Sequence, residues 1–237
     1  MTLRPASPAS DPDRLRRRLA TATLIGVAIY ILVDVVLQGL PPYYSPISEA
    51  ESNLAVGPYG WVMDLNFLLR GVLTVCLVIA LSRVGPPRLT RTIGLTLTAI
   101  GGVSSAVLAG FPTDVVRPGG PGEMSMLVAT SAVGDIHIVL ATIGFIAALS
   151  GFAVLTVWMG GSPLGIRRGD GRRPRTFTAA IVCVIVGFIG LLWIVQTSQP
   201  ASLSQVAGLA ERLALAGILG WVAVVCVGVL GLPRVSR

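Results

Sequence analysis

The chain has 237 residues, of which 53% are hydrophobic and only 12% charged, and its mean hydropathy is +0.80. Soluble domains carry roughly 25% charged residues, and half that share is too little to cover the surface of a water-soluble domain of this length. The composition therefore excludes a soluble domain and predicts a polytopic membrane protein. The formal net charge of +7 is compatible with nucleic-acid binding, but the positions of the basic residues argue against that partner.

Six segments are apolar and long enough to cross a bilayer, which takes about 20 residues of helix. They cover residues 19–40, 60–82, 92–111, 135–159, 176–196 and 210–232. A basic tail of residues 1–18 precedes them, a short tail of residues 233–237 follows them, and no connector has room for a soluble domain. We therefore predict an all-α fold, a single six-helix transmembrane bundle over residues 19–232.

The arginines are distributed asymmetrically among the connectors. Fifteen of the 18 lie in the two tails, in the second-to-third connector and in the fourth-to-fifth connector. By the positive-inside rule these segments face the cytoplasm, so both termini are predicted to be cytoplasmic in a multi-pass protein of the cell membrane. The basic excess is then an orientation signal that also suits anionic lipid headgroups, and no nucleic-acid partner is expected. The three exceptions are Arg70, Arg117 and Arg212.

The numbers of lysines, histidines and cysteines exclude several kinds of site. All 18 basic residues are arginines, so no lysine can form a Schiff base or act as a general base. His137 is the only histidine, which excludes a bis-histidine haem and a paired-histidine zinc site within one chain. The three cysteines lie apart in apolar segments, where they are expected to be packing residues. We expect no cofactor. The cysteines are Cys76, Cys183 and Cys226.

Small residues at a spacing of four mark helix faces that permit close approach. We expect these rows to pack within the bundle, with dimerisation as the alternative. The rows are Gly102, Ala106 and Gly110 on the third span, Gly144 and Ala148 on the fourth, and Ala216 and Gly220 on the sixth.

Polar residues of the spans gather in the half of the bundle that is predicted to face away from the cytoplasm. Tyr30, Asp34 and Gln38 share one face of the first span. Asn66 and Arg70 share a face of the second, with Arg70 near the middle of the membrane. Exposure of these faces to lipid is costly at this depth, so we expect them to face the bundle interior.

We expect Arg70 to pair with a carboxylate of the same half, namely Asp34, Asp64 or Asp135. A further acidic and basic pair, Glu211 and Arg212, opens the sixth span from that side. The candidates for ligand binding or for a polar network are Asp34, Asp64, Asn66, Arg70, Asp114, Asp135, His137, Glu211 and Arg212.

Three functions are compatible with this pattern. The first is binding or transport of a polar small molecule or lipid headgroup in an outward-facing polar cleft, with Arg70 or Arg212 holding an anion. The second is a membrane-embedded hydrolase, in which Asp114, Asp135 and His137 hold a metal or activate water. That metal site is weak, because residues two apart on a helix diverge. The third is an assembly partner whose polar network only fixes helix packing. A non-enzymatic role is favoured.

Short motifs at the helix ends resemble a known family. They are Ser45-Pro46-Ile47-Ser48, Gly57-Pro58-Tyr59-Gly60-Trp61, Phe111-Pro112-Thr113-Asp114, His137, and Gly208-Leu209-Ala210-Glu211-Arg212. In order and spacing they are similar to patterns of a prokaryotic membrane family catalogued as domain of unknown function 998 (DUF998), over about residues 20–230. The resemblance implies a six-span bundle and marks Asp114, His137, Glu211 and Arg212. It implies no reaction.

Overall fold

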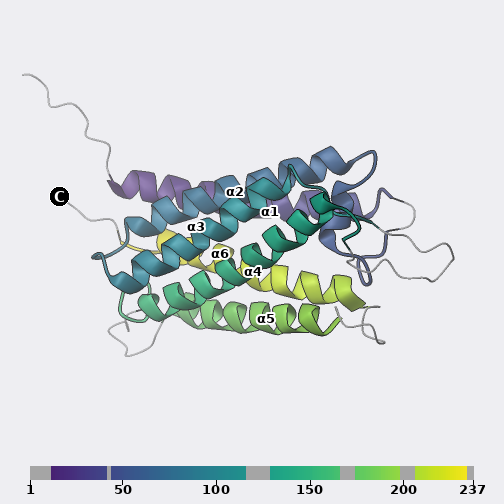
Figure 1. Ribbon diagram of the computed structural model, residues 1–237. Helices are drawn as coiled ribbons and strands as arrows, with labels where there is room; N and C mark the ends of the chain where they lie inside the picture. Colours follow the sequence, from purple (N-terminus) through teal and green to yellow (C-terminus); the bar gives the residue numbers. More distant parts are fainter. Residues whose placement is uncertain (1–11, 42–43, 116–128, 166–173, 198–205, 234–237) are drawn as a thin grey trace, which may run out of the picture.

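The computed structural model describes residues 12–41, 44–115, 129–165, 174–197 and 206–233. Within these ranges the protein is all-helical and contains no strand (Figure 1). Six helices are long and apolar enough to cross a membrane, which confirms the predicted six-helix transmembrane fold. The helices are α1 (Pro12–Gln38), η1 (Glu51–Ala55, a 3-10 helix), α2 (Gly60–Ser82), α3 (Leu89–Leu108), α4 (Ala132–Met159), α5 (Arg175–Thr197) and α6 (Ala207–Leu230).

Four of the helices, α1, α3, α4 and α6, begin three or more residues before the predicted spans. α1 begins at Pro12 rather than at residue 19, because proline suits the first turn of a helix and arginine is a good helix former. α4 begins at Ala132, where the Ser131 side chain accepts a hydrogen bond from the Gly134 backbone N–H and caps the helix. α6 begins at Ala207. The apolar stretch thus marks the part of each helix that can cross the membrane, and these helices continue beyond it at their starts.

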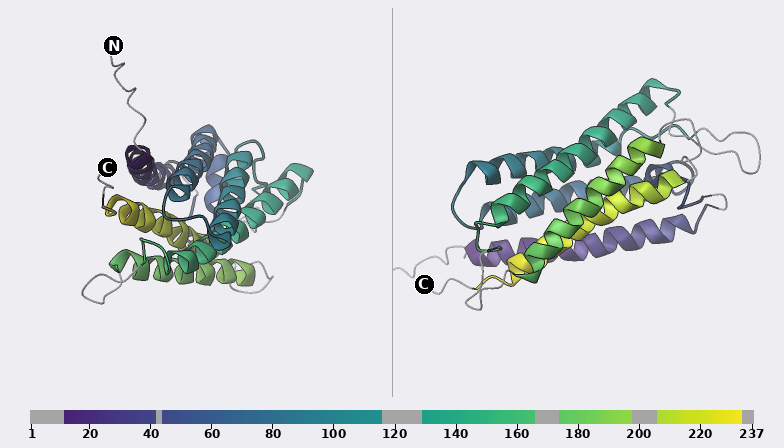
Figure 2. Two further views of the ribbon diagram at one scale, coloured as in Figure 1. Left: turned by 90° about the vertical axis from the view of Figure 1, so that its left-hand side faces the viewer. Right: turned by 90° about the horizontal axis from the view of Figure 1, so that it is seen from below.

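The six long helices alternate in direction and form a bundle (Figures 1 and 2). α3 packs along α4 and α5 packs along α6, while α1 lies against α2 and α6. α4 lies near α5 where α4 ends and diverges from it toward its own beginning, and its backbone comes close to that of α6 at few points. We call the end where α1 begins and α6 ends the basic end, and the opposite end, which carries η1, the η1 end.

Small residues bring neighbouring helices into backbone contact, as membrane bundles require. A Cβ atom built on Gly101 of α3 would lie 2.9 Å from the Ala148 Cβ atom and 3.1 Å from the Gly144 carbonyl oxygen of α4. This confirms that Gly144 and Ala148 form a packing face. On α6 the predicted row is wrong at Ala216, which is exposed, because Gly217 packs against α5 instead. We call the line of close contact between α5 and α6 the α5–α6 seam.

The apolar core is densest toward the basic end. The rings of Phe152 and Trp221 stack with centroids 4.1 Å apart. The Trp221 indole N–H donates to the Thr156 hydroxyl at 2.8 Å, which satisfies the polar atom of a fully buried tryptophan. Large apolar side chains on the outside of the bundle, such as Val157 and Leu192, are 72% and 64% exposed. These outward-facing side chains provide the surface that lipid covers.

The orientation of the bundle in the membrane remains a prediction that labelling can test. In a cysteine-free background, we expect Ile47→Cys, a side chain that is 56% exposed at the η1 end, to react with a membrane-impermeant maleimide added outside intact cells. Gly169→Cys, which lies outside the described residues between α4 and α5, is expected to react only after the cells are opened. The reverse pattern would overturn the cytoplasmic assignment of the termini.

Candidate ligand-binding site

The connector from α1 to α2 is docked on the first turns of α6. The Leu209 backbone N–H donates to the Ile47 carbonyl oxygen at 2.9 Å. Gly208 permits this approach, since a Cβ atom there would lie 2.8 Å from the Pro46 carbonyl oxygen and would clash with the Glu49 carbonyl. Two sequence motifs that are more than 150 residues apart, around residues 45–48 and 208–212, are therefore two halves of one contact.

Arg212 of α6 links the connector to this helix through hydrogen bonds. One guanidinium nitrogen, Nη1, donates to the carbonyl oxygens of Pro46 at 2.7 Å, Glu49 at 3.1 Å and Gly208 at 3.1 Å. The other, Nη2, donates to the Tyr44 hydroxyl at 2.5 Å. Burial raises the pKa of the Tyr44 phenol above its ordinary value, so this hydroxyl is neutral at physiological pH. Arg212 is thus committed to holding the connector in place.

The docked connector inserts Glu51, the first residue of η1, between the helices. Glu51 is 2% exposed. Its carboxylate accepts a hydrogen bond from the Tyr30 hydroxyl at 2.7 Å, and its backbone N–H donates to the Glu211 carboxylate at 2.7 Å. A glutamate from a connector is therefore buried at the η1 end of the bundle, in contact with α1, α2 and α6.

Arg70 lies beside Glu51. Its Nη1 atom is 3.7 Å from the Glu51 carboxylate and donates to the Tyr30 hydroxyl at 3.0 Å. Its Nε atom donates to the Ser105 hydroxyl at 2.5 Å, and Ser105 in turn donates to the Phe67 carbonyl oxygen at 3.2 Å. The prediction that Arg70 pairs with Asp34, Asp64 or Asp135 is wrong: its ion-pair partner is Glu51, because the docked connector reaches deeper than those side chains do.

Five ionisable side chains form one group inside the bundle, in which Glu51 is buried and the other four are partly buried. We call it the charged cluster: Asp34, Glu51, Arg70, Glu211 and Arg212. The acidic members all interact electrostatically with Arg70, and Arg212 acts on Asp34 and Glu211. Three acids and two arginines leave a formal charge of −1 if every group is ionised. Burial raises the pKa of the Glu51 carboxyl to about 8, although Arg70 acts in the opposite direction. Glu51 is therefore mostly protonated at neutral pH.

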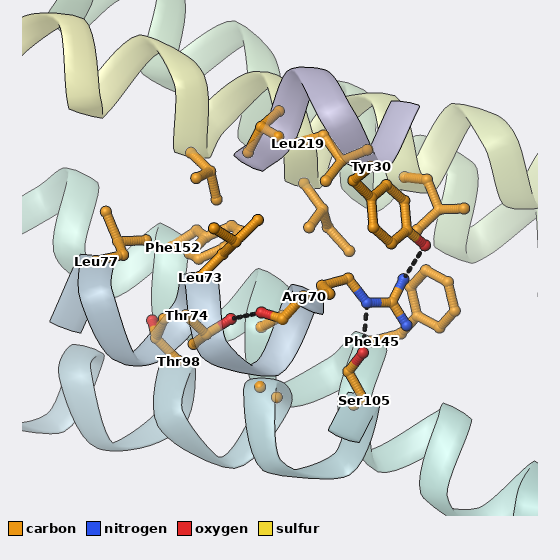
Figure 3. Close-up of a pocket in the computed structure, with 18 of the residues that line it drawn as sticks. Tyr30, Arg70, Leu73, Thr74, Leu77, Thr98, Ser105, Phe145, Phe152 and Leu219 are labelled. Carbon is orange, nitrogen blue, oxygen red and sulfur yellow. Dashed lines mark hydrogen bonds between the residues drawn. The ribbon is translucent and has the colours of Figure 1, made fainter. Parts of the chain in front are cut away.

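A cavity of about 70 Å³ extends from the charged cluster toward the basic end, several times the roughly 10–15 Å³ that one water occupies. Arg70, Tyr30 and Ser105 lie at its η1 end, and Figure 3 shows the Arg70 guanidinium between the other two. The rest of the wall is mainly apolar and includes Leu77 and Phe152. The cavity is thus an apolar chamber with one cation at its end.

Two polar side chains that line the cavity have an atom without a hydrogen-bond partner among the described residues. Arg70 Nη2 makes no hydrogen bond with any described residue, since its Nε and Nη1 atoms make the bonds given above. Thr98, which lines the cavity and is 2% exposed, has a hydroxyl oxygen without a partner among the described residues. Buried polar atoms are normally satisfied, so the buried Thr98 hydroxyl is available to a molecule in the cavity, and Arg70 Nη2 has an N–H group left to donate.

The other predicted residues of α1 and α2 lie around this site in different ways. One Asp34 carboxylate oxygen accepts from Gln38 at 2.7 Å, while the other is buried without a partner within the described structure. Asn66 donates to the Tyr30 carbonyl oxygen at 3.1 Å and supports the cavity wall. Asp64 is partly buried and has no hydrogen bond or ion pair to a described residue.

Asp114 and His137 lie together but apart from the charged cluster, at the junction of α3 and α4. Asp114 accepts from the backbone N–H groups of Thr130 and Ser131 at 2.8 and 2.7 Å, and these hydrogen bonds hold the pKa of its carboxyl below the ordinary value. His137 Nδ1 lies 2.6 Å from the Phe111 carbonyl oxygen. Both side chains tie α3 to the start of α4.

The suggested metal set of Asp114, Asp135 and His137 has little support in this geometry. Asp135 is exposed, while Asp114 is bonded to Thr130 and Ser131 and His137 to the Phe111 carbonyl oxygen. Across the described residues, no group of three or more histidine, cysteine, aspartate or glutamate side chains is arranged to hold a metal ion. The hydrolase hypothesis therefore has no assembled centre in this part of the chain.

Sequence reasoning missed Glu51 and Ser105 as members of the site. Glu51 lies in the predicted connector between the first and second spans, where a carboxylate is ordinarily solvated. The one available signal was the charge of Arg70, since a buried arginine near the middle of a membrane needs hydrogen-bond acceptors and a counter-charge.

Fold and site together define an integral membrane protein with a central chamber and a buried charged cluster. The model of a family described as "Protein of unknown function (DUF998)" matches residues 24–228. The chain belongs to this family. Comparison with curated proteins gives no match, and comparison with solved structures gives none.

Proposed function

We propose that the protein binds a small amphiphile, an alkyl chain with an anionic carboxylate or phosphate head, in the central cavity. The observation that carries this proposal is the position of Arg70, a cation with an unused N–H group at the end of an otherwise apolar chamber. Charge-assisted hydrogen bonds to carboxylate or phosphate are the strongest contacts that a guanidinium makes. The anion is the head of a membrane lipid or that of a free alkyl acid.

The wall of the cavity supports an alkyl chain rather than a purely polar ligand. From Arg70 to Leu77 the cavity follows seven residues of α2, which is about 10 Å and equals an extended chain of about eight carbons. Phe152 and Leu219 line the same space from α4 and α6. Apolar walls with few polar groups are typical of ligand pockets. In this cavity the polar groups lie mainly at the η1 end, beside Arg70.

A route from the bilayer is supported by the wide spacing of the α4 and α6 backbones, which are joined through side chains such as Phe152 and Trp221. Phe145 of α4 and Leu219 of α6 both line the cavity and are only partly buried. An amphiphile passing between these helices brings its head to Arg70 without crossing the connector. This route favours binding or transport of membrane-dissolved molecules over uptake of soluble ones.

Quenching of Trp221 tests the proposal, because its indole stacks on Phe152 in the cavity wall. The protein is placed in phosphatidylcholine nanodiscs at pH 6 with its other tryptophans, Trp61, Trp158 and Trp193, replaced by phenylalanine. Saturable quenching by 8-bromooctanoate is expected, and Arg70→Gln is expected to weaken the apparent affinity at least tenfold, which corresponds to one lost charged hydrogen bond.

Control ligands distinguish the contribution of the anionic head from that of the alkyl chain. The neutral alcohol 8-bromooctanol is expected to quench weakly, and octyl phosphate is expected to displace the bromo acid, whereas inorganic phosphate is not. Arg83→Gln removes the same charge from an exposed position at the basic end and is expected to bind as the parent does. Equal quenching in the Arg70→Gln and parent proteins would refute the proposal. If Arg70→Gln is misfolded, Ser105→Ala takes its place, with a smaller loss expected.

A further inference from the structure

Resting on the anion site proposed above, we propose that this site binds an anion together with a proton on the Glu51 carboxyl, so that anion binding takes up one proton wherever Glu51 is ionised beforehand. The protein would then bind an acid in two parts, the anion at Arg70 and the proton at Glu51. Anion binding and proton binding would be coupled through the single guanidinium that both groups face.

The coupling follows first from competition for Arg70. The Glu51 carboxylate lies 3.7 Å from Arg70 Nη1, and both groups share the Tyr30 hydroxyl. An anion at Arg70 Nη2 therefore stands within a few ångströms of Glu51. Two negative charges that close repel strongly in a site of low dielectric, so one of them is neutralised by a proton.

The formal charge of the charged cluster also indicates that a proton accompanies the bound anion. With all five groups ionised it is −1, and a bound monoanion makes it −2. Each added charge buried in a membrane protein is costly, and no further cation among the described residues of the cluster is free to compensate. Arg212 directs its hydrogen bonds to the connector and Tyr44. A proton on Glu51 restores the charge of −1.

Glu51 is the acid best placed to carry this proton. Tyr30 and Asp34 of α1, Arg70 of α2 and Glu211 of α6 all act on its carboxyl. Glu211 already accepts the Glu51 backbone N–H, which favours its ionised form. Asp34 accepts from Gln38 and, unlike Glu51, has no ion pair with Arg70.

The remaining titratable groups of the connector face elsewhere. The Glu49 carboxylate accepts from the Ser45 backbone N–H and the Asn53 amide, and the Tyr44 hydroxyl donates to the carbonyl oxygens of Glu49 and Ala50. From α3 the neighbour of Arg70 is Ser105, which does not titrate. On α4, His137 lies with Phe111 and Asp114.

The test measures the dissociation constant of 8-bromooctanoate between pH 6 and pH 10 by Trp221 quenching. The probe is fully ionised in this range, since free carboxyl groups titrate near pH 4. The pKa of Glu51 is raised to about 8, so its proton is present below that pH and must be taken from solution above it. The constant is expected to be flat below pH 8 and to be about tenfold higher at pH 9.

Matched variants locate the proton. In Glu51→Gln the rise above pH 8 is expected to disappear, because the amide is neutral at every pH. Glu49→Gln removes a carboxylate two residues away and is expected to retain the rise. Tyr30→Phe removes a hydrogen bond that lowers the pKa of Glu51, so its rise is expected to begin at higher pH; this variant also serves if Glu51→Gln is unstable.

The outcomes separate this inference from the proposed function. Absence of binding at pH 6 would refute the anion site itself. Binding with the same constant at pH 6 and pH 9 would keep the anion site and refute the coupling. If the rise in the dissociation constant persists in Glu51→Gln but disappears in Glu211→Gln, then Glu211 carries the proton and our assignment to Glu51 is wrong. At pH 9, a weakly buffered sample with a pH indicator is expected to take up close to one proton per bound octanoate.

Discussion

Replacing Gly217 by leucine is expected to separate α5 from α6 and to remove most folded protein from the membrane. A Cβ atom at this position would clash with the Gly187 backbone and would lie 2.7 Å from the Cys183 carbonyl oxygen. The atoms in its way are backbone, so no side-chain rotation relieves the overlap. Helices in a bilayer gain little from apolar burial and depend on close packing, and therefore the whole seam between α5 and α6 is expected to open.

Gly228 provides the matched control on the same helix. A Cβ atom there meets its nearest neighbour, the Leu164 Cδ2 atom, at 3.4 Å, which is ordinary contact. Gly228→Ala is therefore expected to fold normally and to gain up to about 1 kcal/mol from helix propensity. The measurement is the yield of monodisperse protein in size-exclusion chromatography, followed by thermal unfolding. Monodisperse Gly217→Leu protein with an unchanged melting temperature would contradict the assigned seam.

The contact between α5 and α6 also shows that the sequence predicts the spans but not the rotation of each helix about its own axis. The spans were predictable because every backbone group in lipid must be bonded within a helix, which makes long apolar segments helical. The rotation of each helix was not, because α6 is apolar on all sides. Gly220 of the expected row does lie against Cys183 of α5, but Ala216 faces outward, and Gly217, one residue further around the helix, meets the Gly187 backbone instead.

The candidate site was predictable in part for an electrostatic reason. Charged groups within the membrane avoid lipid, so Asp34 and Arg70 were expected in the bundle interior. The charged cluster contains both, together with Glu211 and Arg212, which were candidates at the start of the sixth span. Glu51 was not predictable from periodicity, because its burial depends on the docking of the connector on α6. Asp114 and His137 resembled metal ligands as residue types, but as donors and acceptors they fit the hydrogen bonds that close the α3–α4 junction.

Replacing Arg212 by methionine is expected to release the connector and to lower stability by about 3 kcal/mol, the cost of removing hydrogen bonds made by a charged group. Methionine keeps much of the length of the side chain but leaves the carbonyl oxygens of Pro46 and Glu49 and the Tyr44 hydroxyl without their donor. For a chain of this size the melting temperature is expected to fall by roughly 6–12 °C. Since the connector carries Glu51, the charged cluster is expected to lose its order as well.

Two further variants distinguish the hydrogen bonds of Arg212 from its charge. Arg212→Lys keeps the positive charge but lacks the planar fork that serves both the carbonyl oxygens and Tyr44, so an intermediate loss is expected. Arg83→Met removes an exposed arginine outside the cluster and is expected to melt as the parent does. If lysine restored full stability, charge alone would explain the role of Arg212, whereas a methionine variant as stable as the parent would show that α6 does not hold the connector through this residue. Cysteine labelling at Ile47, whose carbonyl oxygen accepts the Leu209 N–H, should become faster in Arg212→Met, because release of the connector exposes its backbone and side chains together.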